Sequence, residues 1–157
     1  MADQPKVFLD TSALFAGLWS DSGGARQILK LAEAGLVTLA VSPQVLSEIE
    51  NNLRRKAPDL LGKLAVLLDR VGLVLMGTAP ETRYEAALTL TGHPGDGRVL
   101  ADAWESGVDF FVTLDRQHFL DNKGLRVALP FPLGTPGDFL LWYRQNYIEK
   151  PHDFPLA

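Results

Sequence analysis

In the segment KVFLDTSAL, residues 6–14, an apolar run ends abruptly at Asp10. A short apolar run of this kind is typical of a strand that is buried on both faces of a parallel sheet. Asp10 stands where the strand leaves the sheet, and two hydroxyl side chains, Thr11 and Ser12, follow it. Ligands of open parallel sheets bind beyond the carboxyl ends of the strands. The stretch therefore predicts a central strand with polar groups at a ligand-binding edge.

Four further short apolar runs predict the remaining strands, at residues 37–41, 73–76, 110–113 and 125–128. Between these runs, apolar residues spaced three and four apart predict helices. One such helix opens at Ser42 and Pro43, which suit the N-cap and the first helical position. Alternating strands and helices predict an α/β fold: a doubly wound central parallel sheet of about five strands, flanked by helices in three α/β/α layers.

The length of 157 residues suits one domain with its own hydrophobic core. The chain shows no internal repeat and no linker, so we expect a single domain over residues 1–157. We expect its core at about residues 6–129 and a C-terminal extension with a helix at about 130–157. The sequence has no cysteine, which excludes disulfides, thiolate zinc sites and cysteine nucleophiles.

Composition and charge restrict where the protein works and what it binds. No apolar run approaches the ~20 residues that span a bilayer, and the start of the chain, MADQPK, does not resemble a signal peptide. We therefore expect a cytoplasmic protein without membrane contact. The net charge of −4 argues against a tight, non-specific nucleic-acid binder. It is compatible with an enzyme whose acidic residues gather around a cation.

Four carboxylates occupy positions where such a centre could form. Asp10 and Asp115 each follow a predicted strand, Asp96 stands at a predicted helix start, and Glu48 lies near the apolar stripe of its helix. Taken singly, Asp96 is equally typical of a helix cap and Glu48 of a solvated side chain. Carboxylates that meet in one crevice repel one another unless a cation joins them. A hard divalent ion with oxygen ligands can then promote attack of water on a phosphodiester.

Four segments, in this order and at this spacing, resemble the PIN-domain family. They are FLDTSAL at residues 8–14, SPQVLSE at 42–48, DGRVLADA at 96–103 and VTLD at 112–115. The likeness spans roughly residues 6–129 and is nearest to the bacterial branch related to VapC-type toxins of toxin–antitoxin pairs. It implies a PIN-like fold with a central parallel sheet and a shared acidic pocket.

The resemblance also implies a set of functional residues. The catalytic and metal-binding carboxylates, for Mg²⁺ or Mn²⁺, would be Asp10, Glu48, Asp96 and Asp115. The supporting hydroxyls, which orient ligands or waters, would be Thr11, Ser12 and Thr113. Because family members typically cut single-stranded RNA and many dimerise, the resemblance implies a homodimeric endoribonuclease. A separate antitoxin protein would be a further partner.

Residues beside these motifs allow two interpretations each. Arg98 and Arg116 adjoin proposed ligands, so they are either substrate contacts or ion-pair partners of the acidic cluster. The basic run at residues 54–56 is more typical of a solvated helix end than of a phosphate guide. His118 follows Asp115 by three residues, and we interpret it as an ordinary loop histidine.

Two further features are interpreted as structural. Asp102 falls six residues after Asp96, so it points away from it on a helix, and we expect it at the surface. The aromatic residues Trp142, Tyr143 and Tyr147 could stack on bases, but packing or dimer contacts suit them better.

Two other function classes, a silent binding module and a phosphoryl-transfer enzyme, share parts of this pattern. A catalytically silent PIN-fold module that binds RNA or protein stays open, because the chain is acidic and residues 92–95, GHPG, lack the extra acidic residue that relatives often carry. A phosphoryl-transfer enzyme with Asp10 as nucleophile is disfavoured. Haloacid-dehalogenase-like phosphatases place a second aspartate two residues later, where this chain has Ser12. A receiver domain would need adjacent acidic residues near the first strand.

Overall fold

The run KVFL forms β1 (Lys6–Leu9), the middle strand of a five-stranded parallel sheet. The computed structural model describes residues 4–71 and 73–149; the end of the expected C-terminal extension, residues 150–157, lies outside this part of the chain. Val7, Phe8 and Leu9 are all fully buried. A continuous apolar run is what a strand covered on both faces requires.

The strand order in the sheet is β3-β2-β1-β4-β5. The other strands are β2 (Thr38–Val41), β3 (Val74–Leu75), β4 (Phe110–Val112) and β5 (Leu133–Gly134). The helices are α1 (Thr11–Trp19), α2 (Gly24–Glu33), α3 (Pro43–Lys56), α4 (Leu61–Arg70), α5 (Glu81–Thr91), α6 (Pro94–Glu105), α7 (Lys123–Ala128) and α8 (Pro136–Tyr143), with short helical turns η1 (Pro58–Leu60), η2 (Arg116–Leu120) and η3 (Arg144–Ile148). Within the described residues, no helix has the length and apolar character needed to cross a membrane.

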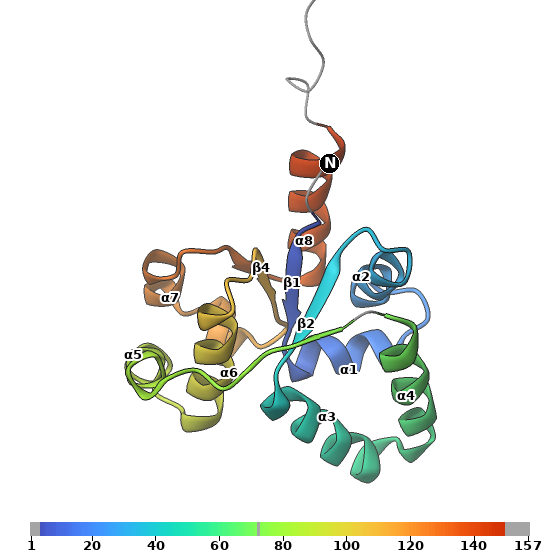
Figure 1. The fold of residues 1–157 in the computed structure, drawn as a ribbon, viewed down its shortest axis with the longest axis horizontal. Helices are drawn as coiled ribbons and strands as arrows, with labels where there is room; N and C mark the ends of the chain where they lie inside the picture. Colours follow the sequence, from blue (N-terminus) through green and yellow to red (C-terminus); the bar gives the residue numbers. More distant parts are fainter. Residues whose placement is uncertain (1–3, 72, 150–157) are drawn as a thin grey trace, which may run out of the picture.

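The helices form a layer on each side of the sheet. From β1 the chain moves outward through β2 to β3, then crosses back to β4 and on to β5. Right-handed crossovers in opposite directions place their helices on opposite faces. Figure 1 shows α5, α6 and α7 to the left of the strands and α2 and α4 to their right. The expected α/β fold, with a parallel sheet of five strands between helices, is confirmed.

An aromatic cluster fills the core beside β1 and β4. The Phe111 ring lies 4.9 Å from that of Phe8, 5.1 Å from that of Phe119 and 6.4 Å from that of Phe131, measured between ring centroids. Phe111 is fully buried, and it joins three segments of the chain to one another. Phe119 belongs to η2, so this cluster anchors the loop that follows β4.

The fifth strand was predicted in the wrong place. Residues 125–128 belong to helix α7, whose start is capped by Asn122 through a hydrogen bond of 3.3 Å from the Leu125 N–H to its side chain. Only Leu125 of these four residues is buried, which suits a surface helix and not an inner strand. The fifth strand is Leu133–Gly134, too short for its residue pattern to reveal and enclosed by prolines. The sheet therefore continues beyond the boundary expected at residue 129.

The last helix also belongs to the core. Trp142 packs on Phe110 and Phe139, with ring centroids 5.3 and 5.6 Å apart, and Tyr143 lies 5.9 Å from Phe139. Tyr147 stacks on Tyr143 at 5.3 Å. The packing interpretation is confirmed for Tyr143, which is buried, and for Trp142, which is half-buried, whereas Tyr147 is exposed.

Asp102 is a second correction, because its side chain is buried and not at the surface. It is 2% exposed, and its carboxylate accepts a hydrogen bond of 2.8 Å from the backbone N–H of Ala79. Burial raises the pKa of the Asp102 carboxyl, while this hydrogen bond and the nearby charge of Arg98 lower it. Helix α6 is buried around most of its circumference, so a position opposite the site is covered as well.

Replacing Asp102 with alanine is expected to destabilise the fold by about 1–3 kcal/mol, because the Ala79 N–H loses its acceptor inside the protein. Asp102→Asn keeps an oxygen acceptor and removes a buried charge, so its free energy of unfolding should stay within about 1 kcal/mol of the wild type. Urea denaturation of the two variants checks this. Equal losses in both would show that the hydrogen bond is not what Asp102 contributes.

Candidate active site

The site forms where β1, β2 and β4 end at the same edge of the sheet. Leu9 lies opposite Val112 in the β1–β4 register, and the Asp10 N–H donates to the Val112 carbonyl at 3.1 Å. Asp10 and Thr113 are therefore neighbours across the two strands. Strand β2 ends beside them at Val41 and passes directly into α3.

Asp10 is held tightly at this edge. Its Oδ1 accepts hydrogen bonds from the Ala13 N–H at 2.9 Å and from the Ser12 hydroxyl at 2.6 Å, which makes Asp10 the N-cap of α1. Its Oδ2 accepts a hydrogen bond from the Thr113 hydroxyl. The Asp10 side chain is only 6% exposed, so its position is set by these contacts and not by solvent.

The same hydroxyls fix the loop after β4. The Ser12 hydroxyl accepts a hydrogen bond of 3.0 Å from the Leu114 N–H. The Thr113 hydroxyl accepts one of 3.0 Å from the Asp115 N–H. Ser12 and Thr113 thus connect the loop that carries Asp115 to the carboxylate at the end of β1.

Glu48 reaches the site from α3. Ser42 caps this helix, accepting a hydrogen bond of 3.1 Å from the Val45 N–H, as the sequence predicted. The Glu48 Oε2 accepts a hydrogen bond of 2.6 Å from the Thr11 hydroxyl, and its Oε1 accepts one of 2.8 Å from the Gln44 amide. Thr11 therefore joins Glu48 to the start of α1.

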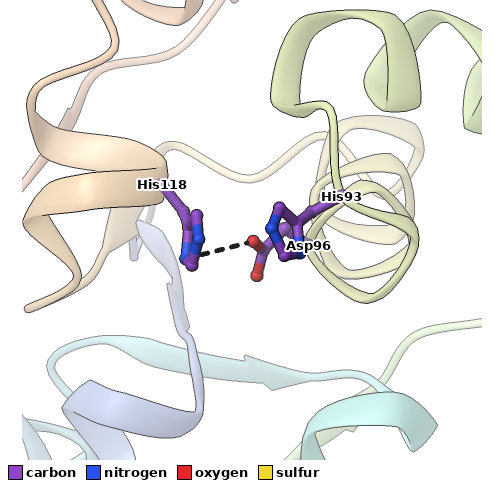
Figure 2. Close-up of side chains that lie close together, drawn as sticks. All are labelled: His93, Asp96 and His118. Carbon is purple, nitrogen blue, oxygen red and sulfur yellow. Dashed lines mark ion pairs between the residues drawn. The ribbon is translucent and has the colours of Figure 1, made fainter.

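Asp96 and Asp115 complete the set from the other helical layer. Asp96 lies in the first turn of α6, which begins at Pro94. Asp115 is the N-cap of η2, and its Oδ1 accepts a hydrogen bond of 3.0 Å from the backbone N–H of His118. Its Oδ2 lies 2.9 Å from the Nδ1 of the His118 ring. The same Nδ1 lies 3.4 Å from Asp96 Oδ2, the contact drawn in Figure 2.

One cavity of about 410 Å³ brings the four predicted carboxylates together. It is lined by Asp10, Thr11, Ser12, Phe15, Glu48, Asn52, Lys56, Asp96, Val99, Asp115 and Phe119. Two of the three predicted hydroxyl residues also line it, and the third, Thr113, is buried behind Asp10 and bonded to it.

The carboxylates of this cavity influence one another's protonation. Burial raises the pKa of Asp10 from its ordinary 3.8 to about 6, with Asp115 adding to the effect and the hydrogen bonds from Ser12 and Thr113 opposing it. Burial also raises the pKa of Asp96, and so do the charges of Asp115 and Glu48, whereas the histidines nearby lower it. Like charges crowded in this way are relieved by a divalent cation. A donor set made of carboxylate oxygens fits Mg²⁺ or Mn²⁺.

The two arginines suggested as substrate contacts lie elsewhere. Neither lines the cavity formed by the described residues. Arg98 lies over the Tyr84 ring at 4.0 Å, and its nearest carboxylate is that of Glu81, at 4.0 Å. Arg116 is 3.9 Å from Asp121 and largely exposed. In this structure neither guanidinium pairs with a proposed ligand, so they are not ion-pair partners of the acidic cluster. Their role as substrate contacts stays a prediction.

Sequence reasoning missed other residues at the site. Asn52 and Lys56 line the cavity, although residues 54–56 were interpreted as a solvated helix end. A signal was present: Glu48, Asn52 and Lys56 are spaced by four, which puts them on one face of a helix. His118 was set aside as a loop residue, yet it touches two of the proposed ligands.

Comparison with known proteins agrees with this architecture. A family model described as a PIN domain matches residues 6–117. Among solved structures, the chain resembles VapBC2 from Rickettsia felis bound to a DNA fragment from its promoter, with 18% identity and a TM-score of 0.60, covering 82% of this chain and 96% of that one. It also resembles PAE2754 from Pyrobaculum aerophilum, with 18% identity and a TM-score of 0.60, covering 92% and 100%.

These structural likenesses concern the fold alone, since the sequence identities are low. A search of curated protein sequences gives no match. The family match, by contrast, spans well over half of the chain and contains all four carboxylates of the cavity. The chain belongs to the PIN domain family.

Proposed function

We propose that the protein is a metal-dependent endoribonuclease and that its Mg²⁺ or Mn²⁺ is held by Asp10, Glu48, Asp96 and Asp115. PIN domains are generally nucleases, which supports a hydrolase. The observation that carries the proposal is the single cavity lined by all four carboxylates. A divalent cation there would supply the positive charge that a phosphodiester needs as negative charge develops on its oxygens.

The residues around the carboxylates hold them ready for this role. Hydrogen bonds from Ser12 and Thr113 fix the two oxygens of Asp10, and Thr11 and Gln44 fix those of Glu48. Ligands that are already oriented need little rearrangement when a cation and a substrate arrive. These hydroxyls are therefore proposed as positioning groups.

Features of the cavity wall support single-stranded RNA as the substrate. Lys56 lines the acidic cavity and also an adjoining one of about 350 Å³, which Trp19 lines as well. Trp19 is 63% exposed and stacks on Phe15, with ring centroids 5.9 Å apart and planes at 15°. Lys56 offers a charge to a phosphate. Exposed aromatic faces stack on bases that are not paired in a duplex.

The partners and the location are proposed on the strength of the family. The resemblance to VapBC2 supports a toxin role with an antitoxin protein as partner. A homodimer is supported by an apolar cavity on the C-terminal helices, where Leu141 and Ile148 are exposed. We further propose that residues 1–157 act as one domain in the cytoplasm.

Purified protein incubated with a mixed pool of single-stranded RNA tests the proposal. Cleavage is expected with Mn²⁺ or Mg²⁺, and it should disappear with EDTA and in Asp96→Asn. The matched control is Asp69→Asn, which removes an exposed carboxylate outside the cavity and should leave cleavage unchanged. If folded protein free of inhibitor does not cut RNA, the nuclease is excluded. If it cuts RNA equally well in EDTA, the metal dependence is excluded. Metal-independent RNA binding would then favour a silent binding module.

A further inference from the structure

Two histidines lie beside Asp96 at the mouth of the site. Ligand atoms of His93, Asp96 and His118, one from each residue, all lie within 4.8 Å of one another. The two imidazole rings are 4.4 Å apart between centroids. Figure 2 shows the Asp96 carboxylate facing the His118 ring, with His93 beside it; His93 comes from the α5–α6 turn and His118 from η2.

The α5–α6 turn determines where His93 and Asp96 lie. Helix α5 ends at Gly92, whose φ of 71° belongs to the left-handed region that favours glycine. His93 is then the N-cap of α6, and Asp96 follows three residues later, so their side chains meet over the first turn of the helix. The turn is held firmly, because a Cβ at Gly97 would lie 3.1 Å from the Leu88 backbone, leaving no room between α5 and α6.

His118 is oriented from behind by Asp115. The carboxylate Oδ2 of Asp115 lies 2.9 Å from the His118 Nδ1, while Nε2 makes no hydrogen bond to any residue that the structure describes. A carboxylate bonded to one ring nitrogen of a histidine is the usual support of metal-binding histidines, since it fixes the ring and makes the other nitrogen a better donor.

We propose that His93, Asp96 and His118 form a binding site for a transition-metal ion of the Zn²⁺ type, which shares Asp96 with the carboxylate centre proposed for Mg²⁺ or Mn²⁺ but adds two nitrogen ligands to it. Two imidazoles and one carboxylate are ligands that Zn²⁺ accepts, whereas Mg²⁺ prefers oxygen ligands alone. Ligand atoms around a tetrahedral Zn²⁺ lie about 3.4 Å apart. In this structure the three ligand atoms lie within 4.8 Å of one another, and His93 is the exposed member of the set.

This site shares Asp96 with the proposed nuclease centre but does not depend on its activity. The histidines contribute nitrogen ligands, which the four-carboxylate set does not have. Zn²⁺ binding can therefore be measured on a protein that never cuts RNA, so failure of one proposal leaves the other intact.

Titration calorimetry with Zn²⁺ on metal-stripped protein tests the proposal. One Zn²⁺ is expected to bind, and His93→Gln and His118→Gln should each weaken its affinity at least about 10-fold. The matched control is His152→Gln, which replaces the remaining histidine of the chain and should leave the affinity unchanged. Circular dichroism of each variant checks that it is folded, and His93 is exposed, so its replacement removes no buried contact.

Three results would overturn the proposal. The first two are that Zn²⁺ does not bind and that it binds with an affinity that either His93→Gln or His118→Gln leaves unchanged. Loss of binding in His152→Gln would place the ion elsewhere on the chain. Co²⁺ in place of Zn²⁺ gives a second readout, because its visible spectrum changes when a histidine ligand is lost.

Discussion

Asp10→Asn is expected to reduce RNA cleavage at least about 100-fold while making the metal-free protein more stable than the wild type. Activity falls because the buried carboxylate at the centre of the proposed ligand set becomes a neutral amide. Stability rises because burial disfavours the ionised carboxylate of Asp10, and the substitution removes that charge. A substitution that merely damages the fold would lower both quantities together.

The sign of the stability change follows from the pKa of Asp10. Folding raises it from 3.8 to about 6, so the folded state binds the proton more tightly than the unfolded state does. Stability of the wild type therefore falls as the pH rises from about 4 to about 6, and stays at the lower level above that range. The shift corresponds to at most about 3 kcal/mol at pH 7. Asparagine avoids this loss, although its NH₂ group gives up one of the hydrogen bonds that Asp10 accepts.

Urea denaturation in EDTA at pH 4 and pH 7 measures this difference. Asp10→Asn should exceed the wild type in unfolding free energy at pH 7 and match it more closely at pH 4. Asp69→Asn serves as the control, with a change within about 0.5 kcal/mol at both pH values. Adding Mn²⁺ should raise the stability of the wild type more than that of Asp10→Asn, since a ligand stabilises only the state that binds it. A variant less stable than the wild type at pH 7 would contradict the argument.

Phe111→Ala is expected to destabilise the fold by about 3–5 kcal/mol, the cost of removing a buried aromatic ring and leaving a cavity. Total stabilities of about 5–15 kcal/mol make this a large share of the whole. The ring contacts Phe8 on β1, Phe119 on η2 and Phe131 before β5, so the surrounding elements are fixed and cannot collapse into the gap.

Phe111→Leu is the matched variant, because it keeps much of the buried volume and should cost clearly less than alanine. Thermal and urea denaturation of both proteins check the prediction. A loss below about 1 kcal/mol for Phe111→Ala would mean that the cluster repacks, and that the loop after β4 is anchored by other contacts.

The fold was predictable where an element has enough residues to show its pattern. Strands β1, β2 and β4 are short, but each ends in three consecutive buried apolar residues, as burial on both faces demands. Strand β5 has two residues, so its pairing with β4 depends on tertiary packing that no local pattern records. Asp102 was misplaced for a similar reason, since its burial depends on a backbone N–H far away in the sequence.

The four carboxylates of the candidate site were predictable, because strand ends and motifs mark their positions in the sequence. Asp10 and Asp115 follow strands that pair at one edge, and the cavity unites them with Glu48 and Asp96. Their roles as ligands remain predictions. Lys56 was missed although its spacing from Glu48 places both residues on one face of α3. The histidines were missed because His93 of the α5–α6 turn and His118 of η2 come together only through packing.

The central position of β1 has a consequence for the order of events during synthesis. The hydrogen bond between Thr113 and Asp10 joins residues that are 103 positions apart, and β1 pairs with β4 across the same interval. Closing so long a loop is entropically costly and tends to come late in folding. A nascent chain that ends before β4 has no partner for that side of β1 and no carboxylate from Asp115. The nascent protein can therefore bind a cation with all four carboxylates only after most of the chain has left the ribosome.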